Sequence, residues 1–176
     1  MTMRSPHGGL QSGRVRAALH YASKRRLARL KAKLARRRYW RILFTAQGSF
    51  DGAGIVEIEF YLSVNGTNIA SDGTPISGEN AFSSASASAF NGSKDDDVFW
   101  GADGINSDSW IGYDFDRLVT ITEFEITSRQ GSESNQVPDA FSLQSSMNGT
   151  DWVTVRSYTD EVDWNENESR KYRVVK

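Results

Sequence analysis

The chain has 176 residues and a formal net charge of −1, so it is long enough for one ordinary domain with an extension. It has no cysteine, which excludes a disulfide scaffold, a cysteine-based zinc site and a thiol nucleophile. Its two histidines, His7 and His20, lie near the N-terminus, so the rest of the chain has no histidine base, and we expect no enzymatic activity.

The charges are distributed unevenly along the chain. Thirteen of the 21 Lys and Arg residues lie within residues 1–41, which contain no acidic residue, and all 22 Asp and Glu residues follow. The first part therefore carries +13 and the second −14, which indicates two separate tasks. No apolar run reaches the ~18 residues of a membrane span or the ~7–15 of a signal-peptide core, so we expect neither. An Arg-rich, acid-free start is also typical of mitochondrial transit peptides, which is a less favoured interpretation of this segment.

A basic arm is predicted over residues 1–38. Residues 14–38 contain no Gly or Pro and are rich in Ala, Leu, Arg and Lys, which favours a helix over about 14–38. Its apolar stripe is thin and its like charges repel at i,i+3 and i,i+4, so it needs a partner. Among partners for the arm, a groove on another protein is favoured over nucleic acid, and a membrane surface is the least favoured of the three. The residues expected to contact the partner are Arg25, Arg26, Arg29, Leu30, Lys33, Leu34, Arg36, Arg37 and Arg38.

The remainder, residues 39–176, shows the alternating pattern of β-strands. Residues 39–46 predict a first strand and residues 55–63 a second, whose even positions from Val56 to Leu62 are apolar and face inward. Glu57 and Glu59 then face outward. Asn65 and Gly66 indicate a hairpin turn, after which residues 67–71 are predicted to return as a strand.

Residues 72–97 form a long passage rich in Gly, Ser, Ala and Asp. Their composition is typical of a disordered linker. Because the passage lies between strands of one domain, we expect an ordered, functional loop instead.

Residues 110–115 and 121–128 are predicted to form neighbouring strands at the centre of the domain. In the first, Ile111, Tyr113 and Phe115 share one face, and a break at Asp116 and Arg117 follows. Further strands are predicted over residues 140–146, 152–158 and 170–175. About eight strands, with no helix outside the arm, indicate an all-β antiparallel sandwich.

Several landmarks in order make residues 81–175 resemble the discoidin, or coagulation-factor type C, domain of the galactose-binding-like superfamily. That family has a small-residue run ending in Asp-Gly, a Trp, then Trp-Ile-x-x-Asp-Leu-Gly, a strand ending near Arg, and Ser-x-Asp-Gly-x-x-Trp. This chain has matching segments at residues 84–92, 99–100, 110–115, 121–129 and 141–152. It departs from the pattern in having Asn91 and Asn148 in place of Asp, and Asp116 in place of Gly.

The resemblance implies an eight-stranded jelly-roll sandwich that binds ligands through loops at one end and is not itself catalytic. Related domains often hold calcium in the loop after the small-residue run. Asn91, Asp95 and Asp96 could supply oxygen ligands for a structural Ca²⁺, with Asp97 beside them. The alternatives are a solvated acidic loop and no cofactor, and Asn91 in place of Asp weakens the calcium prediction.

A glycan site is predicted in the loops, because sugars need an aromatic surface beside groups that hydrogen-bond hydroxyls. Trp164, within the acidic loop, is expected to be an exposed platform, whereas Trp100 and Trp110 are expected to belong to the core. The polar partners expected beside Trp164 are Asn165, Arg129, Asn135 and Asp103.

The start of the sandwich, residues 39–44, is similar to the start of such domains in bacteriophage virion proteins. We therefore expect a structural component of a tail, fibre or decoration layer, assembled in the host cytoplasm as part of a symmetric particle. The arm would bind other virion proteins, and the sandwich would bind host-surface glycan or strengthen the shell. The alternatives are a non-viral carbohydrate-binding module and a nucleic-acid-binding protein that uses the arm.

Overall fold

A computed structural model of the chain describes residues 35–46, 52–78, 85–95 and 98–174. The chain divides into two compact units, Met1–Ala35 and Arg36–Lys176. The arm prediction falls outside the described residues up to residue 34, and so do the contact residues from Arg25 to Leu34. Nothing in the described ranges is a helix long and apolar enough to cross a membrane.

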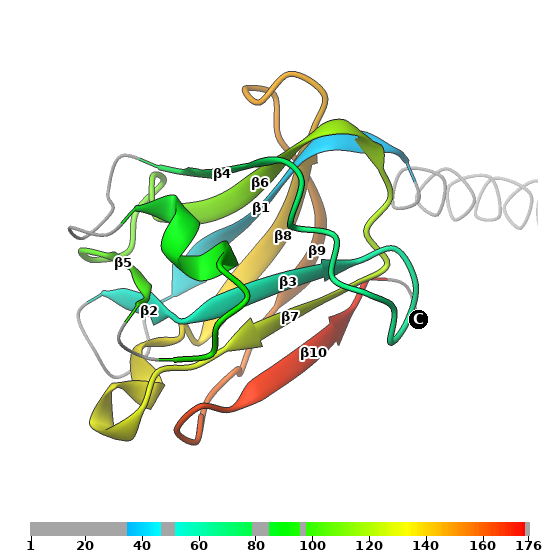
Figure 1. The fold of residues 1–176 in the computed structure, drawn as a ribbon. Helices are drawn as coiled ribbons and strands as arrows, with labels where there is room; N and C mark the ends of the chain where they lie inside the picture. Colours follow the sequence, from blue (N-terminus) through cyan, green and yellow to red (C-terminus); the bar gives the residue numbers. More distant parts are fainter. Residues whose placement is uncertain (1–34, 47–51, 79–84, 96–97, 175–176) are drawn as a thin grey trace, which may run out of the picture. The chain divides into compact units, whose positions relative to one another are not determined.

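Two antiparallel sheets face each other in the second unit (Figure 1). The larger has the order β4-β6-β1-β8-β9, and the smaller has the order β10-β7-β3. A third, two-stranded sheet pairs β2 with β5. The strands are β1 (Arg37–Ala46), β2 (Ala53–Ile55), β3 (Glu57–Tyr61), β4 (Thr74–Ser77), β5 (Trp100–Ala102), β6 (Trp110–Val119), β7 (Glu123–Thr127), β8 (Ala140–Ser146), β9 (Val153–Tyr158) and β10 (Ser169–Arg173).

Alternating side chains of both sheets form a single core. Ile42 of β1 lies opposite Ile111 of β6 and Leu143 of β8, and all three are buried. Phe124 of β7 stacks on Tyr172 and meets the ring edge of Phe141 across the sandwich. The prediction of an all-β antiparallel sandwich is therefore confirmed. The described residues contain ten strands where about eight were expected.

The helical prediction for the end of the arm is wrong at Arg37 and Arg38, which belong to β1. Arg37 pairs with Val119 in the ladder to β6, and Arg38 makes a two-pronged contact with the Asp114 carboxylate at 2.7 and 2.9 Å. Arg36, just before the strand, donates to the Leu118 carbonyl oxygen at 2.8 Å. Cross-strand pairing and these contacts outweigh helix propensity at the three arginines.

Other boundaries also differ from the predictions. Asp116 and Arg117 lie within β6 rather than in a break. Asp116 has a positive φ of 53° and lies opposite a shift in register in β1, so the strand continues through a local irregularity. Leu62 lies beyond the end of β3 and is 49% exposed. No return strand forms over residues 67–71, where Asn68 makes an isolated bridge to Tyr61.

The long passage contains both regular structure and ranges that the structure does not describe. It includes β4 and a 3-10 helix, η1 (Ser86–Phe90), and a second 3-10 helix, η2 (Gly131–Gln136), follows β7. Both correct the expectation of no helix outside the arm. Phe90 of η1 packs against Phe60 of β3 and Tyr113 of β6, which ties η1 to the core.

Candidate functional site

Two loops meet at one end of the sandwich: η2 with the residues that follow it, and residues 159–168 between β9 and β10. The Asn167 N–H donates to the Arg129 carbonyl oxygen at 3.0 Å, and the Glu161 N–H to that of Asp139 at 3.0 Å. The Gly131 N–H donates to the Glu166 carboxylate at 3.1 Å. These bonds hold the loops beside each other without a regular strand.

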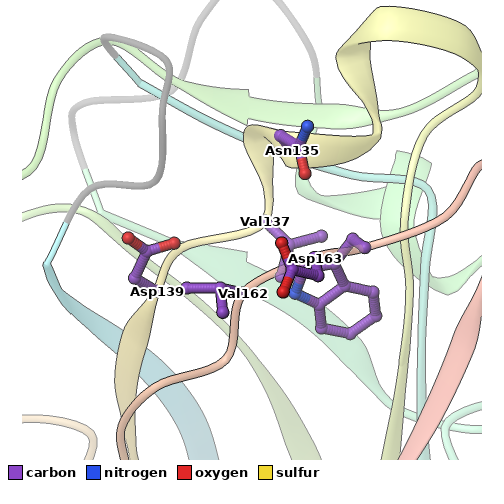
Figure 2. A pocket seen from close by; sticks show the side chains of 6 residues that line it. Asn135, Val137, Asp139, Val162 and Asp163 are labelled. Carbon is purple, nitrogen blue, oxygen red and sulfur yellow. The ribbon is translucent and has the colours of Figure 1, made fainter.

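A pocket of about 230 Å³ lies between these loops, and Figure 2 shows its polar groups. Asp139 at the start of β8 and Asp163 of the 159–168 loop bring two carboxylates, and Asn135 of η2 brings an amide. The remaining lining residues, Val137, Val162 and Trp164, are apolar. A pocket whose wall combines hydrogen-bond acceptors with hydrocarbon suits a ligand that carries both hydroxyl groups and C–H groups.

The expectation that Trp164 is an exposed platform is wrong, because its side chain is only 4% exposed. Its Nε1–H donates to the Glu161 carbonyl oxygen at 2.8 Å, and the Arg170 guanidinium lies 4.1 Å from the ring centroid. Arg170 also donates to the carbonyl oxygens of Val162 and Asp163. Trp164 therefore anchors the acidic loop in the core and lines the pocket as part of its wall.

A charged contact also supports this loop. The Glu168 carboxylate accepts from Arg170 Nε at 2.8 Å and from the Asn165 N–H at 2.8 Å. The Arg170 hydrogen bond, helped by that N–H, lowers the pKa of Glu168 from 4.5 to about 2. The contact therefore holds the loop in place at neutral pH.

Of the residues predicted for glycan binding, Asn135 and Trp164 line the pocket and the other three do not. Asn165 is exposed beside Trp164, and its side-chain amide donates to Glu168 at 3.2 Å. Asp103 follows directly on β5. Arg129 lies over the Phe99 ring at 3.7 Å and donates to the Gln136 side chain at 3.0 Å, so it braces η2.

Four lining residues were missed by sequence reasoning: Val137, Asp139, Val162 and Asp163. Asp163 and Val162 directly precede Trp164, so the acidic loop itself was the available signal. Asp139 and Val137 flank a proline at the start of a strand, which shows no pattern that distinguishes a ligand contact from a strand boundary.

The loop proposed for calcium lies elsewhere, beside β3. The Asn91 side-chain oxygen accepts from the Ser93 N–H at 2.6 Å, Asp95 is exposed, and Asp96 falls outside the described residues. The Lys94 ammonium lies 2.6 Å from Glu125 Oε1 and 3.5 Å from Glu59 Oε2. Within the described ranges no three His, Cys, Asp or Glu side chains gather as a metal site. The calcium site stays a prediction.

Glu57 adds an unusual carboxyl group to that region. It lies on the face of β3 away from the core, as expected, but it is 1% exposed. Its Oε1 accepts from the Gly92 N–H at 3.2 Å, and Oε2 has no hydrogen-bond partner among the described residues. Burial is the main reason that its pKa rises from 4.5 to about 8, and Glu59 adds to the effect.

Comparison with known proteins identifies a family for the larger part of the chain. The family model of the F5/8 type C domain matches residues 68–176. This range includes the pocket and β4 to β10, while β1, β2 and β3 precede it. No curated protein and no solved structure matches the chain.

Proposed function

Because the chain belongs to the F5/8 type C domain family, we propose that it is a non-enzymatic binding module whose pocket between η2 and the 159–168 loop recognises a glycan. Domains of this family are generally binding modules for carbohydrate or protein rather than enzymes. The match covers the segments that build the pocket, so the proposal concerns a part of the chain that has the family's pattern.

The composition of the pocket is the observation that carries the glycan proposal. Its two carboxylates and one amide can accept hydrogen bonds from sugar hydroxyls, and its valines and indole offer apolar contact. Its volume is below the ~300–1,000 Å³ of sites for larger ligands, so it suits one sugar unit at the end or side of a chain. Its charge favours neutral or amino sugars over acidic ones.

Binding to a glycan array by wild type and Asp163→Asn tests this proposal. Asp163 has a positive φ of 57°, which Asn tolerates, so the variant keeps the loop while it removes the charge. Asp160→Asn is a matched control, because Asp160 belongs to the same loop, has a φ of 61° and does not line the pocket. We expect Asp163→Asn to lose about tenfold in affinity, and the control to bind as wild type does. No glycan binding, or equal binding by all three proteins, would contradict the proposal.

The module's setting is proposed to be a bacteriophage virion, with the basic arm anchoring it to other particle proteins. The support is the separation of +13 in residues 1–41 from −14 in the remainder, which indicates an attachment segment and a displayed domain. Removal of residues 1–34 leaves β1 intact, so we expect a folded sandwich that no longer enters particles. Normal incorporation of the shortened chain would refute the anchor.

The same charge separation favours nucleic acid as a second partner of the arm. Thirteen cations without an acid would produce affinity that falls steeply with salt, by up to ~0.9 log units per log unit of salt for each phosphate neutralised. Titration of the full chain with duplex DNA at several salt concentrations tests this. The nucleic-acid alternative fails if DNA binding is absent at low salt.

A further inference from the structure

A cationic and aromatic cluster lies on the outer face of the larger sheet. Arg41 of β1 is directly opposite Gly112 of β6 on one side and Gln144 of β8 on the other, and Gln144 is opposite Thr154 of β9. Their strand neighbours Ile42, Ile111 and Leu143 point into the core, so this row points away from it. Together with Trp110 and Trp152, the residues Arg41, Gln144 and Thr154 are called the Arg41 platform.

The Arg41 guanidinium is held in one orientation by its neighbours. Its Nε donates to Gln144 Oε1 at 2.8 Å, and Gln144 Nε2 donates in turn to Thr154 Oγ1 at 3.1 Å. Its central carbon lies 4.8 Å from the ring centroid of Trp110 and 4.1 Å from that of Trp152. The two ring centroids are 5.9 Å apart, with the ring planes inclined at 47°. Cation–π contacts and a hydrogen bond therefore fix this side chain before any ligand arrives.

The position of Arg41 also depends on the glycine opposite it. A Cβ on Gly112 would come within 2.7 Å of Arg41 Cβ, so a larger residue would push the arginine away from its row. Arg41, Gln144, Trp110 and Trp152 are all half-buried, and Thr154 is exposed. The platform is thus pre-formed and still reaches solvent.

The charge of Arg41 lacks a close counter-ion. Arg38 and Arg170 each lie within 4.0 Å of a carboxylate oxygen, whereas no carboxylate of the described residues lies so close to Arg41. Asp108, which is exposed, acts on Arg41 only from a greater distance. Burial beside the indoles lowers the pKa of Arg41 to about 10, so it remains a cation at neutral pH. A partly desolvated cation without a close anion is suited to bind one.

We propose that the Arg41 platform binds the carboxylate of an acidic sugar, such as a uronic or sialic acid. Nε is engaged with Gln144, and the Nη groups make no hydrogen bond to a described residue, so they are available for charge-assisted bonds to a carboxylate. The indoles of Trp110 and Trp152 border the same spot and offer apolar contact to the sugar's C–H groups. The Gln144 amide and the Thr154 hydroxyl can bond its hydroxyls. This site is separate from the pocket between η2 and the 159–168 loop, and it prefers negatively charged ligands where that pocket favours neutral or positively charged ones.

Titration of the full chain tests the platform, with galacturonic acid oligomers, sialyllactose and their carboxyl-reduced forms as probes. Binding is followed by tryptophan fluorescence, because Trp40, Trp100 and Trp164 are buried while Trp110 and Trp152 are half-buried. We expect at least one acidic probe to bind, and its carboxyl-reduced form to bind about tenfold more weakly.

Two variants distinguish binding at the Arg41 platform from binding at the basic arm, because both variants keep the arm unchanged. Gln144→Glu is nearly isosteric and places a carboxylate against Arg41, so it should weaken acidic-sugar binding about tenfold while the protein stays folded. Arg41→Lys keeps the charge but loses the planar fork and should have a similar effect. Arg156→Lys is the matched control, because Arg156 also lies on this sheet over an aromatic ring, at 5.2 Å from the Tyr158 centroid, but outside the platform.

The outcomes discriminate between ligands and between parts of the chain. Equal binding by wild type, Gln144→Glu and Arg41→Lys would assign the acidic sugar to the arm and overturn the proposal. Equal affinity for carboxyl-reduced probes would overturn it too. The wild type could bind polyglutamate more tightly than every acidic sugar and lose that binding in Gln144→Glu. This result would make the platform an acidic-peptide site and refute the sugar assignment.

Discussion

Replacement of Glu57 by Gln should change how the stability of the sandwich depends on pH. The carboxyl group is 1% exposed, and only its Oε1 accepts a hydrogen bond from a described residue, the Gly92 N–H. Burial therefore raises the pKa to about 8 in the folded protein, against 4.5 for an exposed glutamate. Gln keeps the shape of the protonated acid and the acceptor for Gly92, but it cannot ionise.

The size of the effect follows from the two pKa values. Since the folded state holds the proton more tightly, the stabilising contribution is complete below pH 4.5 and is lost as pH rises towards 8. Each pH unit in that window costs the wild type about 1.4 kcal/mol, and the loss levels off near the folded-state pKa. The total loss is ~3 kcal/mol at pH 7 and ~4 kcal/mol at pH 8. Glu57→Gln lacks this loss. We expect it to match the wild type at pH 4 and to exceed it by ~3 kcal/mol at pH 7.

Urea unfolding of both proteins at unit steps from pH 4 to 8, with EDTA present throughout, measures the difference. Glu59 and Lys94 also act on Glu57, but they are present in both proteins, so the comparison isolates residue 57. Asp163→Asn removes one negative charge from an exposed position, at a positive φ of 57° that Asn tolerates, and so reports the effect of net charge alone. A stability difference between wild type and Glu57→Gln that stays constant from pH 4.5 to 8 would show that the pKa of Glu57 is not raised in the folded protein.

Three further predictions concern other parts of the sandwich. Glu168→Gln should destabilise the protein at neutral pH but not near pH 2. The pKa of Glu168 is lowered in the folded protein, so its contact with Arg170 stabilises the fold above pH 4.5, and this stability is lost as pH falls through about 2. Thermal unfolding at both pH values checks this. Gly54→Ala should cost about 1 kcal/mol in urea unfolding, because its Cβ would push apart the Gln136 and Arg129 side chains, which are hydrogen-bonded to each other. If calcium binds the loop of residues 91–97, Ca²⁺ should raise the Tm, EDTA should reverse it, and Asn91→Ala should abolish the response; an equal rise in the variant would rule out Asn91 as a ligand.

Much of the fold could be predicted from alternation alone. The β8 boundaries, residues 140–146, were predicted correctly, and the inward residues of β6 are buried as expected. The family pattern expected over residues 81–175 agrees with the F5/8 type C match over residues 68–176. Trp100 is fully buried, as expected, whereas the core prediction for Trp110 is wrong, because its indole is half-buried on the outer face of the larger sheet beside Arg41. The features predicted correctly depend on neighbours along one strand, and the order of residues shows them directly.

The candidate sites depended on contacts between distant segments. Trp164 has the sequence context of an exposed platform, yet the loop turns its indole inward under Arg170. Glu57 has the alternation of an outward residue, yet the loop around Gly92 covers it. In both cases a loop with no periodic pattern decides the exposure, so alternation cannot predict it.

Local order and composition are therefore enough to predict the longer strands, the family and the separation of basic arm from acidic domain, but not the short strands β2, β4 and β5. Which side chains meet depends on the tertiary structure. Asp139 and Asp163 come together because two loops are bonded at one end of the sandwich. Arg41, Trp110 and Trp152 come together because antiparallel register brings three separate segments onto one face. Register and loop closure join residues that are far apart in the chain, and no local pattern specifies those pairs.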